Sequence, residues 1–329
     1  MPHVAKFVAG IDLGGTNIKA ALVSEDREVV AKLSRPTDAG KGPQPLMDAM
    51  ASAVRDMLHE AGHDIGDLLA AGFGAPGPMN WQTGVVFQPP NLPGWRDVPL
   101  AAEMQQRLGV PCFVDNDANV AAYGEFWMGA GRGTENMAVL TLGTGVGGGV
   151  IVFGKLLRGP DGTAAELGHL VVQRDGREST SPARGALEAY ASVTGMVRTA
   201  REGLEAGKES ALVSRCGGDW DKLTGAMISE EAKAGDTFAR WVFDETATWL
   251  GLGIVSIVHY QNPEKVVLCG GMIAAGDMLF DTVRRVVQEN TFDVPGKRCQ
   301  IVPAGLGADS GVLGAAGVAH ARWQDSQKR

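Results

Sequence analysis

Residues 7–24 read FVAGIDLGGTNIKAALVS, in which a glycine-rich turn separates two apolar segments. The apolar segments 7–11 and 19–24 predict two strands that are joined through Gly14-Gly15. A third strand is predicted at 28–33, so the chain is expected to begin as a meander. Apolar residues at helical spacing then predict a helix, and a further strand follows it, at 46–61 and 68–73. The first unit is therefore predicted as β-β-β-α-β.

A similar order returns after Cys112, with a helix, a strand, a second glycine-rich turn and another strand. These predicted elements are 118–128, 136–142, the turn Leu142-Gly143-Thr144-Gly145-Val146-Gly147, and 148–153. The chain is thus predicted to contain a similar arrangement of strands, helix and glycine-rich turn twice. Later helices are predicted at 186–201, 238–260, 277–288 and 312–323, with a buried strand at 265–269. Residues 203–223 are the least patterned stretch, and we expect a surface excursion there.

Length and composition indicate an ordinary globular protein. The chain has 329 residues, enough for two domains with separate cores, and is 44% hydrophobic and 21% charged. A net charge of −8 argues against a generally nucleic-acid-binding surface, because phosphate backbones are held by clustered lysine and arginine. Apolar runs such as 250–258 are short for a bilayer span, and no signal-like segment opens the chain, so we expect a cytoplasmic protein without a membrane partner.

The four cysteines show no CxxC spacing, so neither a disulfide framework nor a zinc knuckle is predicted from them. Cys112 and Cys269 lie in apolar, strand-like segments, which predicts buried thiols that act as small hydrophobic groups. The other two are Cys216 and Cys299.

Both glycine turns have the composition of phosphate-binding loops. Glycine lets backbone N–H groups approach an anion closely, and a neighbouring threonine hydroxyl adds a donor. Either turn alone is also explained as a tight hairpin, but two turns in matched settings favour phosphate binding. Neither turn matches the P-loop, and no G-x-G-x-x-G followed by a helix and a distant acid supports a dinucleotide-binding fold. The residues concerned are Gly14, Gly15, Thr16, Gly143, Thr144, Gly145 and Gly147.

Two aspartates stand where chemistry could occur. Asp12 ends the first strand and could hold the water shell of a Mg²⁺ ion on nucleotide phosphates, or act as an Asx-turn residue. Asp117 precedes a predicted helix, so it could be the N-cap of that helix. A carboxylate at a helix N-terminus is also expected to be ionised, the state in which it accepts a proton from a hydroxyl.

Three further side chains offer acceptors for sugar hydroxyls, namely Glu166, His169 and Glu188. An i, i+3 surface pair is the alternative interpretation of Glu166 and His169. Composition alone does not separate the two interpretations.

Read together, these motifs closely resemble the ROK family of repressors and sugar kinases over nearly the whole chain. Each motif is modest alone, but their order and spacing are specific. They are Gly10-Ile11-Asp12-Leu13-Gly14-Gly15-Thr16, Gly74-Ala75-Pro76-Gly77-Pro78, Pro90-Asn91-Leu92-Pro93-Gly94-Trp95, Asn116-Asp117-Ala118-Asn119, Leu142 to Gly149, Glu166-Leu167-Gly168-His169 and Cys269-Gly270-Gly271.

The resemblance implies an α/β, actin-like ATPase fold related to ribonuclease H, with two α/β domains around a central cleft. It implies a small domain at 1–117 to which a C-terminal helix at 305–329 returns, and a large domain at 118–304. Its implied activity is ATP- and Mg²⁺-dependent phosphorylation of glucose in carbohydrate metabolism, and a homodimer is expected.

The resemblance also implies residue roles. Asp117 corresponds to the catalytic base for the 6-hydroxyl of the sugar, and the two glycine turns correspond to the phosphate loops. Gly270 and Gly271 correspond to the adenosine-side turn. The implied sugar-binding positions are Asn91, Asn116, Asp117, Glu166, His169 and Glu188.

One departure concerns a structural zinc site. Family members usually carry three cysteines in a C-x-C-G-x-x-G-C-L-E pattern, whereas this chain has Ser179, Ser181 and Ala186 in that frame. Hydroxyls and a methyl group cannot supply thiolates, so we predict no zinc despite His169. We expect His169 to bind sugar as a neutral imidazole that uses both ring nitrogens.

Two alternatives remain open at this stage. One keeps the enzyme class but changes a substrate, to another hexose, an amino sugar or a polyphosphate donor. The other is a sugar-sensing transcriptional repressor, which in this family carries a DNA-binding winged helix before the kinase-like body. A first strand at about Phe7 leaves no room for that module, so the repressor is disfavoured.

Overall fold

The computed structural model describes residues 6–89 and 91–328, and it contains two five-stranded sheets. Pro90, the first residue of the predicted motif around Asn91, lies outside the described residues, as do 1–5 and 329 at the ends of the predicted domain bounds. In the first sheet the strand order is β3-β2-β1-β4-β7. β1, β2 and β3 form an antiparallel meander, and β4 and β7 run parallel to β1, which confirms the predicted first unit. The strands are β1 (Phe7–Leu13), β2 (Asn17–Ser24), β3 (Val29–Pro36), β4 (Leu68–Ala75) and β7 (Cys112–Asn116).

The second sheet repeats this topology, with the order β10-β9-β8-β11-β12. Its first three strands in the chain are again antiparallel neighbours, and the last two are parallel to β8. The predicted repetition of one arrangement of strands is therefore confirmed. The strands are β8 (Met137–Leu142), β9 (Val146–Val152), β10 (Lys155–Leu156), β11 (Lys265–Cys269) and β12 (Gln300–Pro303). A small hairpin, β5 (Met79–Asn80) with β6 (Val85–Val86), follows β4.

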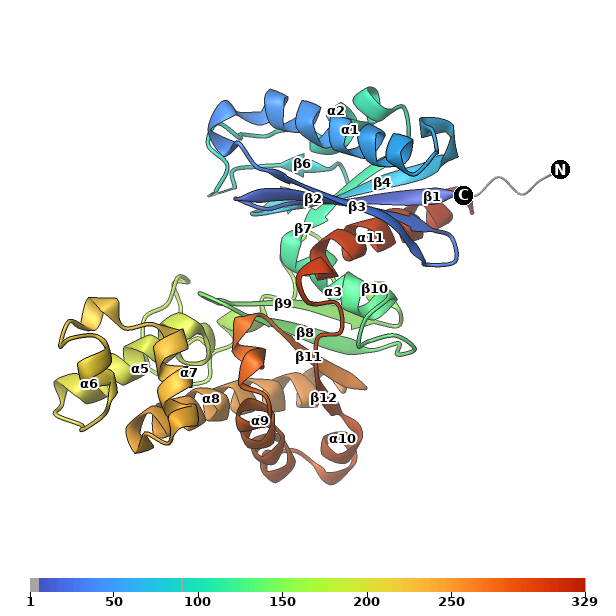
Figure 1. The fold of residues 1–329 in the computed structure, drawn as a ribbon. Coiled ribbons are helices and arrows are strands. Elements are labelled where there is room, and N and C mark those ends of the chain that lie inside the picture. Colours follow the sequence, from blue (N-terminus) through green and yellow to red (C-terminus); the bar gives the residue numbers. More distant parts are fainter. Residues whose placement is uncertain (1–5, 90, 329) are drawn as a thin grey trace.

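Helices cover both faces of the first sheet. α1 (Pro43–Glu60) and α2 (Leu100–Leu108) lie on one face, and α11 (Ser310–Gln327) contacts β1 and β4 on the other (Figure 1). α1 places its apolar residues on the sheet because they recur at helical spacing, as Leu46, Met50, Val54 and Met57 do. All four are buried.

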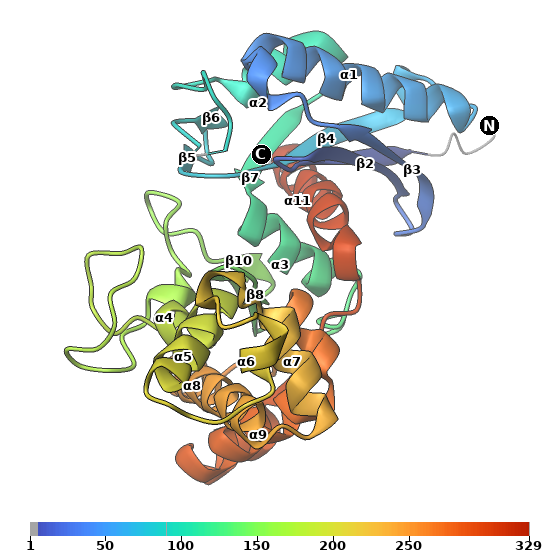
Figure 2. The same ribbon diagram turned by 60° about the vertical axis from the view of Figure 1, so that its left-hand side comes forward.

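α3 (Asp117–Trp127) continues directly from β7 and packs along α11, between the two sheets (Figure 2). The two helices approach closely because glycines face each other's backbone. A Cβ at Gly314 would overlap the Val120 carbonyl, and a Cβ at Gly124 would overlap the Ser310 carbonyl. These glycines fix α3, and with it the first residue of α3, against α11.

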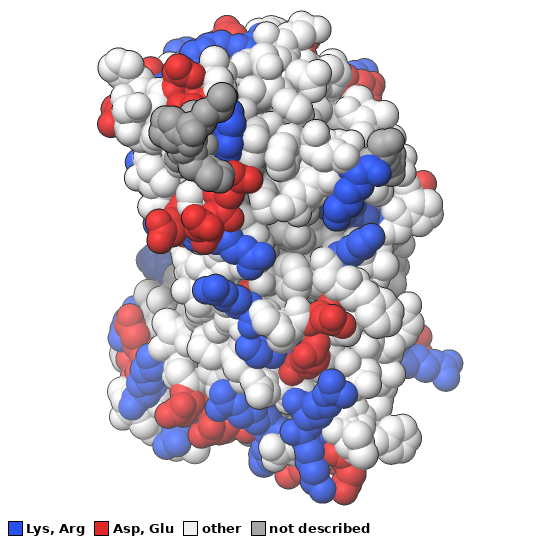
Figure 3. All heavy atoms as spheres, turned by 90° about the vertical axis from the view of Figure 1, so that its right-hand side faces the viewer, with Lys and Arg blue, Asp and Glu red and all other residues white. Residues whose placement is uncertain are grey.

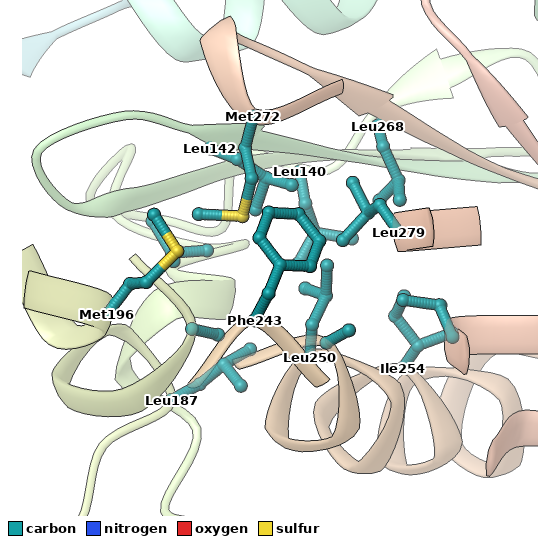
Figure 4. Close-up of a cluster of buried hydrophobic side chains, with 14 of the residues drawn as sticks. Leu140, Leu142, Leu187, Met196, Phe243, Leu250, Ile254, Leu268, Met272 and Leu279 are labelled. Atoms are coloured by element: carbon teal, nitrogen blue, oxygen red, sulfur yellow. The ribbon is translucent and has the colours of Figure 1, made fainter. Parts of the chain in front are cut away.

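The second sheet packs on α8 (Thr237–Gln261) and α9 (Asp277–Asn290). Phe243 of α8 lies at the centre of this core, among Leu140, Leu142, Leu250 and Met272 (Figure 4). Truncating such a buried aromatic side chain to alanine typically costs about 3–5 kcal/mol of stability. α8 is long and apolar enough to span a membrane by length and composition, which the short apolar run at 250–258 did not suggest, but 56% of its apolar 18-residue window is buried inside the protein.

Some predicted elements differ from the structure. The single helix predicted at 186–201 is two helices, because Ser192 ends one and caps the other by accepting a hydrogen bond from Gly195 N. The stretch 203–223 lies largely at the surface, as expected, but it is anchored by Leu212, Cys216 and Leu223, which are buried in or beside the second core. The remaining helices are α4 (Glu188–Ala191), α5 (Val193–Glu205), α6 (Leu212–Arg215), α7 (Gly225–Ala234) and α10 (Asp293–Arg298).

All four cysteines are buried and unpaired, and the predicted burial of Cys112 and Cys269 is confirmed. Burial raises the pKa of the Cys112 and Cys269 thiols to about 12, so these groups are protonated at neutral pH and pack as small hydrophobic groups.

Candidate active site

Two cavities meet at Asp117. Cavity A, of about 380 Å³, contains the first glycine turn, and cavity B, of about 370 Å³, lies on the side of Asn116. Both volumes are in the range of small-molecule sites. Cavity A is lined by Asp12, Leu13, Gly14, Gly15, Pro76, Asn91, Asp117, Ala121, Thr141, Cys269, Gly270, Gly307, Ser310 and Gly311. Cavity B is lined by Gly77, Pro78, Met79, Asn116, Asp117, Ala118, Asn119, Gly147, Gly148, Gly162, Thr163, Ala164 and Glu166.

Asp117 is held at the junction of β7 and α3. Asn116 is the N-cap of α3, since its side-chain oxygen accepts from Ala118 N at 2.9 Å and Asn119 N at 3.4 Å. Asp117 is the first helical residue, and its Oδ1 also accepts from Ala118 N, at 2.8 Å. The interpretation of Asp117 as the cap is therefore wrong. Capping by Asn116 leaves the Asp117 side chain accessible to solvent in the two cavities, although the surrounding protein still encloses its carboxyl group.

The charge state of Asp117 reflects a balance. Burial by the surrounding protein raises the pKa of its carboxyl above the ordinary value of 3.8, while hydrogen bonds from Ala118 and Asn116 lower it by less. The helix N-terminus alone would hold this group ionised, as the sequence suggested. Desolvation is the larger effect, so the carboxylate binds a proton more readily than a surface aspartate does.

Asp12 shares cavity A with Asp117. Burial raises the pKa of Asp12, the charge of Asp117 raises it further, and Lys19 lowers it. Lys19 lies opposite Asp12 in the β1–β2 pairing, and its ammonium donates to the Ala308 carbonyl at 2.7 Å. Two carboxylates that repel each other in one cavity are a favourable setting for a divalent cation, because the cation offsets that repulsion. The residues of cavity A thus fit a Mg²⁺ ion held by Asp12.

Besides Asp117, which borders both cavities, three of the other five predicted sugar-binding residues line them. Asn116 and Glu166 line cavity B, whereas Asn91 lines cavity A beside Gly15. The other two, His169 and Glu188, are outside both linings. The His169 ring lies 3.9 Å from the Glu166 carboxylate through its Nε2, and the Glu188 carboxylate accepts from Val146 N at 3.3 Å.

The glycine turns are divided between the cavities. Gly14 and Gly15 line cavity A, together with Gly270 from the turn after β11. Gly147 lines cavity B instead, and Gly145 packs against the Glu188 carboxylate. The other predicted turn positions, Thr16, Gly143, Thr144 and Gly271, lie at the ends of the same strands without lining either cavity.

Sequence reasoning did not single out several lining residues. Thr141, the second-last residue of β8, and Ser310, the first residue of α11, both line cavity A. Thr163 enters cavity B from the segment before Glu166. The position of Thr141 at a strand end beside a glycine turn was a usable signal, whereas Ser310 reaches the site only through the packing of α11.

The frame of the family's zinc site does not fit a metal. The Ser179 and Ser181 hydroxyls hydrogen-bond to each other at 3.1 Å, and Ala186 pairs with Val171 in a β-bridge. His169 Nδ1 is buried without a partner, so the ring does not use both nitrogens within the protein. Neutral hydroxyls and one imidazole do not make a tetrahedral zinc site. Among residues 6–89 and 91–328, no three His, Cys, Asp or Glu side chains gather as metal ligands.

Arg177 holds this loop by protein contacts. Its guanidinium donates to the Ala189 carbonyl and to Thr199 Oγ1, pairs with Glu202, and lies 5.0 Å from the Tyr190 ring. Its side chain is only 15% exposed. Since Ala189 and Tyr190 directly follow Glu188, Arg177 fixes the loop to the helix that starts with Glu188.

A glycine turn on each of two topologically equal sheets, with one aspartate at the crossing between them, matches a known family along the chain. The model of the ROK family matches residues 8–322. The chain belongs to the ROK family. Its fold is the α/β, actin-like ATPase fold of ROK sugar kinases, as expected.

Relatives within the ROK family are similar over almost their full length. The chain is 38% identical to the glucokinase of Halalkalibacterium halodurans over 94% of this chain and 93% of that protein. The ROK hexokinase structure from Thermus thermophilus has a TM-score of 0.82 at 32% identity, covering 97% and 99% of the two chains. A ROK glucokinase from Streptomyces griseus, solved in complex with glucose and AMPPNP, has a TM-score of 0.74 at 35% identity, covering 96% and 99%.

Proposed function

We propose that this ROK protein transfers the γ-phosphoryl group of ATP to the 6-hydroxyl of glucose. The observation that carries the proposal is that one carboxylate, Asp117, borders both cavities. A nucleophile in cavity B and a donor in cavity A would then lie on two sides of the same acid. The similarity to glucokinases from several bacteria supports glucose as the acceptor.

Asp117 accepts the proton of the sugar hydroxyl as the oxygen–phosphorus bond forms and ADP leaves. In a loose transition state this proton leaves late, so orienting the hydroxyl matters more than base strength. The raised pKa of Asp117 suits this role, since a base that is too acidic takes up a proton poorly.

The donor phosphates are placed in cavity A, where Gly14 and Gly15 leave their backbone accessible and Gly270 marks the adenosine side. Gly143, Thr144, Gly145, Gly147 and Gly271 complete the nucleotide-binding turns in this proposal. Asp12 would hold a Mg²⁺ ion in cavity A, and the ion would supply positive charge beside the donor phosphates.

Cavity B is the sugar site in this proposal, with Asn116 and Glu166 as hydroxyl partners. Asn91, His169 and Glu188 join it when the two halves close. We assign the halves as 1–117 with 305–329, and 118–304. Closure would exclude water, which otherwise accepts the phosphoryl group, so ATP hydrolysis without sugar should be slow.

Cytoplasmic location and a homodimer are part of the same proposal. Lysine and arginine side chains are interspersed with aspartate and glutamate over the face shown in Figure 3. Such a mixed surface, with a net charge of −8, favours a small-molecule enzyme over a DNA-binding repressor. A gel-shift assay at low salt with mixed genomic DNA fragments should show no binding, and a stable shift would support the repressor instead.

The deciding experiment is a coupled assay of purified protein over a grid of acceptors and donors. The acceptors are glucose, mannose, fructose, N-acetylglucosamine and N-acetylmannosamine, and the donors are ATP and polyphosphate. We expect the highest kcat/KM with glucose and ATP. Polyphosphate is the main competing donor, since a polyphosphate/ATP-glucomannokinase is among the structural relatives. A preference for an amino sugar, or for polyphosphate, would replace the corresponding part of the proposal.

A further inference from the structure

Arg158 connects the two sheets beside the candidate sugar site. It follows β10 of the second sheet, and its Nε donates to Asp115 Oδ2 of β7 in the first sheet, at 2.7 Å. The Arg158 side chain is 14% exposed and that of Asp115 is 1% exposed. A nearly buried ion pair thus joins segments that lie 43 residues apart in the chain.

The same aspartate organises the turn that carries Asp117. Asp115 Oδ1 accepts from Asn116 N at 2.9 Å and from Asn119 Nδ2 at 3.0 Å. These two asparagines lie on either side of Asp117 in the sequence. Any rotation of the Asp115 carboxylate would therefore disturb the residues that flank the base.

Arg158 also holds two other walls of cavity B. Its guanidinium lies 4.7 Å from the Trp81 ring, just after β5, whose Met79 lines the cavity. The Arg158 carbonyl accepts from Ala164 N at 3.1 Å, which closes the loop 159–163. Gly162 of that loop packs against Trp81 and lines cavity B as well, where a Cβ would approach the indole to 3.1 Å.

We propose that Arg158 is a positioning residue for sugar phosphorylation, which sets the orientation of Asp117 and the shape of cavity B through Asp115, Trp81 and the loop 159–163. The inference rests on the proposed function. Arginine suits this task because its planar group forms a directed hydrogen bond and stacks on an aromatic ring at the same time. Lysine carries the same charge, but its ammonium group is not planar and lacks the fixed set of N–H donors of a guanidinium.

The test is Arg158→Lys, which retains the charge beside buried Asp115. We expect kcat to fall by about tenfold to a hundredfold, since small misplacements of reacting groups have effects of this size. The KM for glucose should rise and the KM for ATP should stay within about twofold, because the contacts of Arg158 with Trp81 and the loop 159–163 lie on the side of cavity B and not of cavity A. The matched control is Arg284→Lys, whose arginine stacks on Phe280 at 5.2 Å and donates to the Ile301 carbonyl away from both cavities. It should be kinetically normal.

A double variant separates positioning from stability. Arg158→Met with Asp115→Asn removes both charges, so no unpaired ion remains buried, and its melting temperature should be near that of wild type. Turnover should stay low in this variant. Recovery of wild-type kcat and glucose KM would overturn the inference, as would wild-type kinetics in Arg158→Lys or an equal loss in Arg284→Lys.

Hydrogen exchange on the sugar-free enzyme gives a readout that does not depend on activity. Amides of 159–166 and 116–119 should exchange faster in Arg158→Lys than in wild type, and those of 143–147 should not change. Unchanged exchange at 159–166 would contradict the positioning role. If the wild-type protein phosphorylated none of the sugars, the proposed function would be wrong. The exchange rates would still show whether Arg158 orders the segments 116–119 and 159–166.

Discussion

The carboxylates of Asp12 and Asp117 line one cavity, and the charge of Asp117 contributes, after burial, to the raised pKa of Asp12. They come from the first strand of the first sheet and from the helix that leaves its last strand. The pair makes cavity A negative where nucleotide phosphates are proposed to bind. Without a cation, the two carboxylates would repel the phosphates of the donor. The proposed need for Mg²⁺ therefore follows from both Asp12 and Asp117.

Asp117→Asn should lower kcat by about a hundredfold to ten-thousandfold, the usual range for loss of a general base. Glucose binding, measured by calorimetry, should change little because the amide occupies the same volume. Asp277→Asn is the matched control, since Asp277 is also the first residue of a helix but lies outside both cavities. Near-normal turnover in folded Asp117→Asn would remove Asp117 from the mechanism.

The stability of the protein should depend on pH through Asp117. Because its pKa is raised above 3.8 by folding, the folded state binds this proton more tightly than the unfolded state. The contribution to stability is therefore lost as the pH rises from 3.8 through the folded-state pKa. Asp117→Asn should melt at a higher temperature than wild type at neutral pH, and the gap should narrow as the pH falls. If the difference in melting temperature between Asp117→Asn and wild type widened at acid pH, folding would not raise the pKa of Asp117.

Metal removal should affect activity and stability differently. EDTA should abolish phosphorylation, since the donor needs Mg²⁺, and added Mg²⁺ should restore it. The melting temperature without substrates should be the same with and without EDTA, because Ser179, Ser181 and Ala186 cannot hold a structural zinc. Metal analysis that found one tightly bound zinc per chain would be the contrary result.

Gly143→Ala should impair nucleotide binding without impairing folding. A Cβ at Gly143 meets no neighbouring atom within 4 Å, so the protein itself tolerates the methyl group. If the turn binds phosphate, the methyl group should displace a backbone contact worth about 1–2 kcal/mol and raise the KM for ATP by about tenfold. Gly40→Ala is the control, because Gly40 also has open space around it and lies far from the turn in the sequence. Equal KM values for the two variants would argue against a phosphate contact at Gly143.

Arg177→Met should lower the free energy of unfolding by about 2 kcal/mol, because the carbonyl of Ala189 and the hydroxyl of Thr199 lose a shielded donor. Arg174→Met, in the same loop, should have almost no effect, since its pair with Asp175 is fully solvated. Urea unfolding of both variants measures the difference. Similar stabilities would show that the loop does not depend on Arg177.

The sequence predicted the strands beside the two glycine turns well, because the relevant signals are local, whereas the short strands β10 and β12 were not predicted. The strands around Gly14-Gly15 and the second turn were recognisable from apolar segments that end at glycines, and their bounds agree with the structure within a few residues. Ser192 illustrates a failure: a continuous helical pattern concealed a break that one side-chain cap creates. Leu212 illustrates another, because a weak local pattern said nothing about burial by distant helices.

The candidate site was predictable only in part. Asp12 and Asp117 were named because they adjoin a strand end and a helix start, Glu166 because it offers acceptors for sugar hydroxyls, and Asn116 through the family resemblance. All four line the cavities. Ser310 could not be found in this way, since its place depends on how α11 packs more than 290 residues after Asp12 in the chain. Arg158 was missed for the same reason: its partner Asp115 belongs to the other sheet.

The packing of α11 on β1 and β4 has a consequence for biosynthesis. During translation the meander emerges well before α11, the helix that covers its second face. One apolar surface of the nascent first sheet must therefore stay open until the whole second sheet and α11 have left the ribosome, and that interval is when chaperones would be expected to act.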